Sequence, residues 1–197
     1  MVRIPMMTEQ ANIQSTEAEA LIAQIKERAG NLYRTRQLLC AESLVVTLNK
    51  AFDGGLSDDQ AIAIAAPFSA AMGDSGCICG ALSGAVLACG LFVGNNQPYR
   101  HRKQMRHSAR QLHDAFRAAN GATCCRVLSG NGRCDSHQTR FLQCANITEN
   151  AAEMAARLIL SERPELARSA DHGFLRRLDT SISALMTRLL RKARIKM

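Results

Sequence analysis

The chain has 197 residues, of which 47% are hydrophobic, only 4% are aromatic and none is tryptophan. This length suits a single domain, and the alanine- and leucine-rich, aromatic-poor composition favours helices over strands. The net charge is +8. We see no secretory signal and no run of about 18 apolar residues, so we expect a cytoplasmic protein rather than a secreted or membrane-spanning one.

The N-terminal part predicts a tail and two helices. Residues 1–14 are expected to form a loose tail. Thr16 and Glu19 have the spacing of a capping box, which would open the first helix. Gly30 is expected to end or interrupt that helix, and a second helix is predicted from about residue 32 to 52.

A third helix is predicted over residues 58–71. Ser57 and Gln60 form a second capping box in front of it, and Pro67 should kink or break it. The sequence "GDSG" that follows is typical of a turn.

The next predicted helix, residues 80–92, is unusually rich in small side chains. Gly80, Gly84 and Ala88 recur every four positions, so they share one helix face. Each glycine costs up to about 1 kcal/mol in a helix interior. We therefore expect this face to let another helix or a cofactor approach closely.

The second half of the chain predicts further helices. One should run over residues 99–120 and end at Gly121. A short helical turn and a Gly/Asn loop should follow, then a turn that ends at Cys144. Asn146 with Glu149 would start another helix, which stops before Pro164.

The last predicted helix, over residues 170–195, is amphipathic and basic, with a net charge of +5 between residues 171 and 197. It could pack on its own domain or form a homodimer, lie on a membrane surface, or steer an acidic redox partner. A second basic stretch lies between Arg100 and Arg110. Nucleic-acid binding is not favoured, because zinc-finger spacing, an RNA-binding strand motif and aromatic residues for base stacking are missing.

Together these elements predict an all-α, single-domain bundle of about seven helices. The expected divisions are a loose tail over residues 1–14, a cysteine-rich helical domain over 15–164 and the basic C-terminal helix over 165–197. No convincing strand pattern is present.

The cysteines are the unusual feature of the composition. In a cytoplasmic chain, clustered cysteines favour redox chemistry or metal binding over structural disulfides. The C-x-x-C, C-x-x-C-H and zinc-ribbon spacings are all absent. The eight cysteines are Cys40, Cys77, Cys79, Cys89, Cys124, Cys125, Cys134 and Cys144.

Several of these cysteines are predicted at helix ends. Cys79 precedes the glycine-rich helix, where the helix dipole and free N–H groups should lower its thiol pKa. Cys125 is expected near the start of a helical turn, and Cys144 at the junction before the next helix. Cys89 lies in an apolar run and is expected to be a buried core residue.

The segment Cys79-Gly80-Ala81-Leu82-Ser83-Gly84 carries a resemblance to a known family. It is similar to the C-G-A-x-x-G signature of the C_GCAxxG_C_C family of redox proteins. Upstream, Cys40 in "CAESLVVTLNKAF" resembles the first family cysteine. Downstream, "GATCCRVLSG" resembles the segment of the third cysteine in a register that selects Cys125, and Cys144 resembles the fourth.

This resemblance implies a helical redox protein with one site built from Cys40, Cys79, Cys125 and Cys144, beside Gly80 and Gly84. Two chemistries fit it. The four thiolates could hold an iron–sulfur cluster or another metal for electron transfer. Alternatively, Cys79 and Cys125 could be catalytic thiols that cycle through disulfides. Zinc would make the site structural, and a site without any cofactor is the remaining alternative.

Three cysteines, Cys77, Cys124 and Cys134, are additional to the family pattern. They could supply auxiliary ligands, and Cys77 could be a resolving thiol. The expected partner of a redox site is a redox protein that the sequence does not identify. A different class of function is a non-catalytic helical module, in which the basic C-terminal helix binds a protein, a membrane surface or nucleic acid.

Overall fold

The computed structural model describes residues 6–94, 97–130, 137–180, 182, 183 and 185, with side chains described from residue 16 onward. All regular elements in these ranges are helices, which confirms the predicted all-α, single-domain class. None of the helices in these ranges is long and apolar enough to cross a lipid bilayer.

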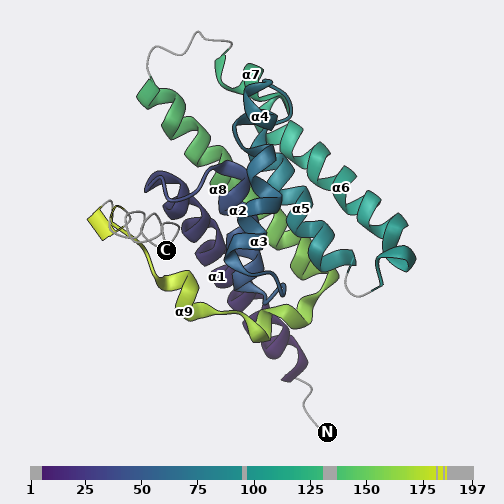
Figure 1. Ribbon diagram of the computed structural model, residues 1–197. Coiled ribbons are helices and arrows are strands. Elements are labelled where there is room, and N and C mark those ends of the chain that lie inside the picture. Colours follow the sequence, from purple (N-terminus) through teal and green to yellow (C-terminus); the bar gives the residue numbers. More distant parts are fainter. Residues whose placement is uncertain (1–5, 95–96, 131–136, 181, 184, 186–197) are drawn as a thin grey trace, which may run out of the picture.

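Helix α5 (Gly80–Gly94) is the centre of the bundle (Figure 1). It packs against α2 (Cys40–Ala51), α6 (Pro98–Asn120) and α8 (His137–Glu162), while α1 (Met6–Arg34) covers α8 and α2. A helix that is apolar on all sides needs neighbours on all sides. The buried core around α5 is built mainly from alanine and aliphatic side chains, including Leu44, Leu48, Ala85, Ala88, Ala152, Ala155 and Ile159.

Helix α1 is longer than the sequence predicts. It begins at Met6, so the loose tail expected over residues 1–14 is helical from that residue on, and it continues through Gly30 to Arg34. A side chain at Gly30 would overlap Glu149 of α8, which is ion-paired with Arg34. The glycine therefore admits a neighbouring helix and does not end its own.

The helix predicted over residues 32–52 is in fact the end of α1 and all of α2, separated by a turn. Arg36 in this turn has a left-handed backbone with φ of 55°. Helix α2 begins at Cys40, because the Leu39 N–H donates to the Glu42 carboxylate at 2.9 Å and starts a new helix there. Cys40 thus lies at the N-terminus of a helix, whereas the sequence pattern predicted it inside one.

The capping box of the third helix is confirmed. The Gln60 N–H donates to Ser57 Oγ at 3.2 Å, and the Ser57 N–H donates to Gln60 Oε1 at 2.9 Å. Helix α3 (Asp58–Ala65) ends before Pro67, as predicted, in a 3-10 turn (Ala66–Phe68).

Beyond this turn the segment α4 (Ser69–Asp74) departs from a right-handed helix. Four consecutive residues, 70–73, have left-handed backbone angles. Such angles are unfavourable for residues other than glycine. One consequence is that the backbone N–H of Ala70 hydrogen-bonds the Cys40 thiol, so the unusual turn contributes a donor to a cysteine.

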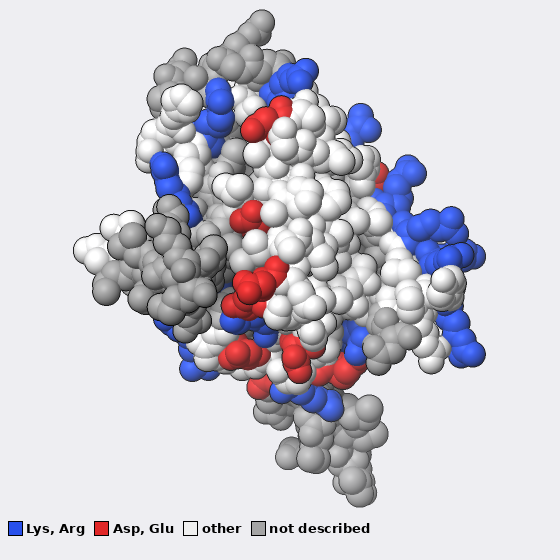
Figure 2. Space-filling model, viewed as in Figure 1, with Lys and Arg blue, Asp and Glu red and all other residues white. Residues whose placement is uncertain are grey.

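The helix predicted over residues 99–120 is confirmed as α6. Gly121 ends it with φ of 77°, and its N–H donates to the Arg117 carbonyl at 2.8 Å. The basic residues of α6 are exposed, and blue atoms gather in Figure 2 along the edge where Figure 1 places this helix. They are Arg100, Arg102, Lys103, Arg106, Arg110 and Arg117.

Helix α7 (Cys125–Leu128) is the predicted short turn, but α8 differs from the prediction. It runs without interruption from His137 to Glu162, so the boundary expected between Cys144 and Asn146 is wrong. No glycine or proline occurs in α8 to stop it. Cys144 consequently lies inside a helix, and Thr148 Oγ donates to its carbonyl at 2.8 Å.

The continuous helix predicted from residue 170 is wrong as far as residue 180, whereas the described residues 182, 183 and 185 are helical. A 3-10 segment (Pro164–Ser169) leads to the short helix α9 (His172–Arg176), and the backbone is then non-helical to residue 180. Asp179 fixes this segment, because its carboxylate accepts hydrogen bonds from Arg28 at 2.9 Å and from Gln37 at 3.0 Å. Residues 186–197, which hold most of the basic charge, lie outside the described residues.

Candidate four-cysteine site

The four cysteines selected from the sequence lie on separate elements. Cys40 is the first residue of α2, and Cys79 directly precedes α5. Cys125 is the first residue of α7, and Cys144 lies on α8. Figure 1 shows α4 and α7 together at one end of the bundle, away from the N-terminus, and this is the end at which α5 begins.

Two glycines allow α2 to lie against the start of α5. A Cβ atom at Gly80 would overlap the Cys40 Sγ atom and lie 2.8 Å from the Phe68 carbonyl oxygen. A Cβ atom at Gly84 would lie 2.8 Å from the carbonyl oxygen and 2.9 Å from the Cα atom of Ala41. Gly80 therefore borders a site thiol, whereas Gly84 contacts the backbone of α2. Whether either glycine touches a cofactor stays a prediction.

Backbone hydrogen bonds fix Cys79 beside the loop that leads into α7. The Cys79 N–H donates to the Thr123 carbonyl at 2.8 Å, and the Arg126 N–H donates to the Gly76 carbonyl at 3.0 Å. These two bonds hold the segment before α5 alongside the segment that contains Cys125.

The Cys79 thiol is buried, with an exposed fraction of 6%. Burial raises its pKa to about 12, although the N–H groups of Ala81 and Leu82 in the first turn of α5 oppose this change. The sequence-based expectation of a lowered pKa is therefore wrong. The helix N-terminus acts in the expected direction, but the loss of hydration outweighs it. Cys40 and Cys125 raise the pKa further, which places all three thiols within electrostatic range of one another.

Cys125 connects this group to α8. Burial is the main cause that raises its pKa to about 11, and the nearby Cys144 and Cys40 raise it further. Burial also raises the pKa of Cys40. Cys125 faces the site thiols, whereas its neighbour Cys124 faces Gly76, which confirms that the two adjacent side chains diverge. Cys40, Cys79 and Cys125 thus lie near one another and are protonated at neutral pH, and Cys144 joins this group through Cys125.

Tyr33 of α1 is a member of this group that the sequence did not reveal. A side-chain hydrogen bond joins Tyr33 and Cys144. Burial raises the pKa of Tyr33 most, and Cys144 and Cys40 raise it further. Its ring stacks on Phe141 with centroids 5.3 Å apart. Tyr33 belongs to no cysteine motif and is far from Cys144 in sequence, so only the packing of α1 on α8 brings it to the site.

Arg140 of α8 is the second such residue. Its charge lowers the pKa of Cys125, opposing the effect of burial, so the two side chains lie close together. Its Nε atom is buried and has no hydrogen-bond partner in the part of the chain that the structure describes. A buried donor without a partner is uncommon, and here it offers positive charge beside the thiols.

The donor chemistry of this site fits a soft metal centre better than the present geometry does. Four thiols are the usual ligands of iron–sulfur clusters and structural zinc, and Arg140 would offset their negative charge. However, no group of three or more His, Cys, Asp or Glu residues among the described ones is arranged to hold a metal ion. The four thiols therefore do not form a preassembled metal site among the described residues.

The remaining cysteines divide into two groups. Cys89 is 2% exposed and its Sγ atom lies 3.9 Å from the Ala155 carbonyl oxygen, which confirms the predicted core role. Cys77 and Cys124 lie at the surface next to the site, and a hydrogen bond joins their thiols. This bond raises the pKa of Cys77 and lowers that of Cys124. Cys134 lies outside the described residues.

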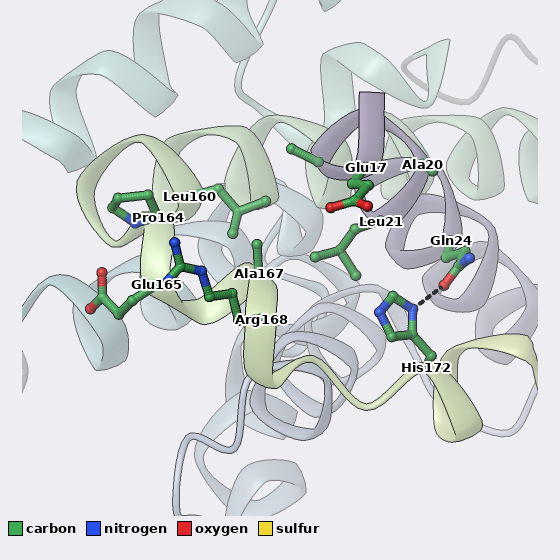
Figure 3. Close-up of a pocket in the computed structure, with 11 residues that line it drawn as sticks. Glu17, Ala20, Leu21, Gln24, Leu160, Pro164, Glu165, Ala167, Arg168 and His172 are labelled. Carbon is green, nitrogen blue, oxygen red and sulfur yellow. Dashed lines mark hydrogen bonds between the residues drawn. The ribbon is translucent and has the colours of Figure 1, made fainter. Parts of the chain in front are cut away.

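Two pockets in the described part of the chain lie outside the cysteine cluster. A pocket of about 730 Å³ lies between α1, the end of α8 and the segment leading to α9 (Figure 3), and no cysteine lines it. Its polar groups include a hydrogen bond of 2.9 Å between His172 and Gln24, which Figure 3 shows at one side of the opening. A second pocket, of about 480 Å³, is lined by Tyr33, Leu39 and Phe141 and therefore adjoins the cysteine site.

The sequence of these segments also agrees with a known family. Residues 38–158, more than half of the chain, match the model of the family described as "Putative redox-active protein (C_GCAxxG_C_C)". The chain belongs to the C_GCAxxG_C_C family. The matched region contains all four site cysteines and excludes Tyr33. Comparison with curated proteins and with solved structures gave no match.

Proposed function

We propose that this C_GCAxxG_C_C protein is an electron-transfer protein whose Cys40, Cys79, Cys125 and Cys144 thiols hold a redox-active metal centre, an iron–sulfur cluster. The gathering of four thiols from four separate elements at one end of the bundle supports the proposal. A thiolate set of this size and type is typical of iron–sulfur ligation. A cluster bound there would supply one-electron transfer.

The surrounding residues have definite tasks in this proposal. The thiols must give up their protons to bind a metal, and their mutual proximity makes this unfavourable until a cation is present. Arg140 offsets the charge of the resulting thiolates. Tyr33 hydrogen-bonds Cys144 and orients it, a role that second-shell partners commonly play. Binding also requires the four side chains to turn toward a common centre.

The test is anaerobic isolation of the full chain, followed by iron, sulfide and visible-absorbance measurements and by reconstitution with iron and sulfide. We expect bound iron and sulfide, and their loss in Cys40→Ser and Cys144→Ser variants. Cys89→Ala is the matched control, because Cys89 is a buried core residue outside the four-cysteine site. This variant should bind iron and sulfide as wild type does. A reconstituted wild-type chain free of iron would refute the proposal.

A second candidate is a Cys79–Cys125 thiol–disulfide couple in the same site. The hydrogen bond between the Cys79 N–H and the Thr123 carbonyl favours it, because it holds the two cysteines in adjacent segments. In this case, the iron-free protein should lose two titratable thiols on oxidation. Replacing either cysteine should abolish the couple, and Cys40→Ser should leave it intact.

The proposal assigns the protein to a reducing compartment, the cytoplasm. All seven cysteines that the structure describes are free thiols, as expected where disulfides do not persist. The electron donor or acceptor would be another redox protein that docks at the end of the bundle containing α4 and α7.

A further inference from the structure

Cys77 and Cys124 form a pair of their own beside the four-cysteine site. Cys77 is exposed and Cys124 is half-buried. A side-chain hydrogen bond joins the two thiols, and Cys124 Sγ also donates to the Gly76 carbonyl at 3.0 Å. Cys124 Sγ thus lies against the residue next to Cys77, and the two thiols are neighbours that are more accessible from solvent than the buried Cys79 and Cys89.

The backbone fixes this contact from both sides. Hydrogen bonds from the Cys79 N–H to the Thr123 carbonyl and from the Arg126 N–H to the Gly76 carbonyl enclose the pair. The Arg126 Nη2 atom donates to the Ser75 carbonyl at 2.8 Å, which adds a third link. These bonds hold the two segments side by side, and a disulfide requires Cβ atoms about 4 Å apart.

We propose that Cys77 and Cys124 are a second redox pair, which closes to an intramolecular disulfide by exchange with a low-molecular-weight disulfide of the glutathione class and reopens with the corresponding thiol. This inference goes beyond the proposed function, because it uses neither a metal nor any of the four site thiols. Redox-sensitive cysteines are commonly accessible and adjacent to a resolving cysteine, and this pair has both properties.

The exchange proceeds in two balanced steps. One protein sulfur attacks the small disulfide, which forms a mixed disulfide and releases one small thiol. The other protein sulfur then attacks the protein sulfur of that mixed disulfide, which forms the Cys77–Cys124 bond and releases the second small thiol. Two electrons pass from the protein to the small disulfide, and the two S–H protons leave with the released thiols.

Closure would have a structural consequence for the neighbouring site. The new bond would tie the segment that ends at Cys79 to the segment that begins α7 with Cys125. A covalent link at this position limits how far the two segments can separate. The state of the pair would therefore control access to the four-cysteine site from solvent.

The test uses the full-length reduced chain in buffers with an increasing ratio of oxidised to reduced glutathione. After acid quenching, remaining thiols are alkylated with N-ethylmaleimide and the intact mass is measured. We expect wild type and Cys89→Ala to lose two alkylated thiols without gaining glutathione. Cys77→Ser and Cys124→Ser should instead each retain one glutathione as a mixed disulfide.

Two results would overturn the inference. One is a wild-type chain that gains glutathione or stays reduced without forming an internal bond. The other is an internal bond that persists in Cys77→Ser or Cys124→Ser, which would assign it to other cysteines. Fragment-ion sequencing of the wild-type disulfide identifies the joined residues directly, so the test stands even if a variant does not fold.

Discussion

The replacement Gly84→Ala tests whether the glycines of α5 exist to admit α2. A Cβ atom at residue 84 would lie 2.8 Å and 2.9 Å from two backbone atoms of Ala41 and 3.1 Å from the Leu44 Cβ atom. Backbone cannot rotate away as a flexible side chain can. Gly90, in the same helix, is the matched control, because a Cβ atom there meets nothing within 4 Å.

The comparison separates two opposing effects. Both replacements gain helix propensity, worth roughly 1 kcal/mol each. Only Gly84→Ala overpacks the contact with α2, which costs roughly 1–3 kcal/mol. We therefore expect Gly90→Ala to raise the free energy of unfolding and Gly84→Ala to lower it. The difference between the two variants should be about 2 kcal/mol.

Urea unfolding followed by far-ultraviolet circular dichroism measures this difference in the reduced, metal-free chain. With a slope of roughly 2 kcal/mol per molar urea, the two midpoints should differ by about 1 M at equal slopes. If Gly84→Ala is as stable as Gly90→Ala, the reasoning is refuted, because the close approach of α2 would then not depend on the missing side chain.

Three further predictions concern thiols and charge. In the native chain, iodoacetamide at about pH 8 should label exposed Cys77 well before buried Cys89, as followed by peptide mass spectrometry; equal rates would contradict their burial. Burial raises the pKa of Cys79 from 9.0 to about 12. The protonated Cys79 thiol therefore contributes its full stability to the fold below pH 9.0, and this contribution declines as the pH rises toward 12. Metal-free wild type should therefore lose more urea resistance between about pH 7 and pH 10 than Cys79→Ser, and an equal loss would count against this. Burial acts to raise the pKa of Asp179, but hydrogen bonds and the Arg28 charge hold it below 3.8. The Asp179 carboxylate therefore stabilises the fold above that pH, and this stabilisation is lost on acidification. Asp179→Asn should lower the stability by about 3 kcal/mol near pH 7 and by less near pH 3, and an unchanged difference in urea titrations at the two pH values would contradict the assignment.

Local signals in the sequence predicted the elements that local interactions determine. The Ser57 capping box and the end of α6 at Gly121 depend on residues a few positions apart. The boundaries of α1 and α2 were not predictable in this way, because the role of Gly30, which leaves room for Glu149 of α8, depends on a residue far away in the sequence. The C-terminal helix failed for a similar reason, since Asp179 is held by residues of α1 and the following turn.

The candidate site divides along the same line. The spacing and context of the motif selected Cys79 and Cys125, and tertiary structure places them in adjacent segments. Tyr33 and Arg140 carry no sequence signal, because their roles arise only when α1 and α8 pack beside the thiols. The sequence also could not predict the direction of the pKa change at Cys79, since that direction depends on how completely the fold excludes water from the thiol.

The enclosure of α5 by its neighbours also determines when the site can exist. Its thiols come from positions between residues 40 and 144, so they meet only after the long-range contacts of the bundle have formed, which is a late event in folding. A growing chain presents the same thiols one at a time to soft cations and oxidants. A metal centre held by all four thiols, as proposed above, would bind the closed bundle more tightly than the unfolded chain and would stabilise it by mass action. Occupancy of the site would therefore report that synthesis and folding of the chain are complete.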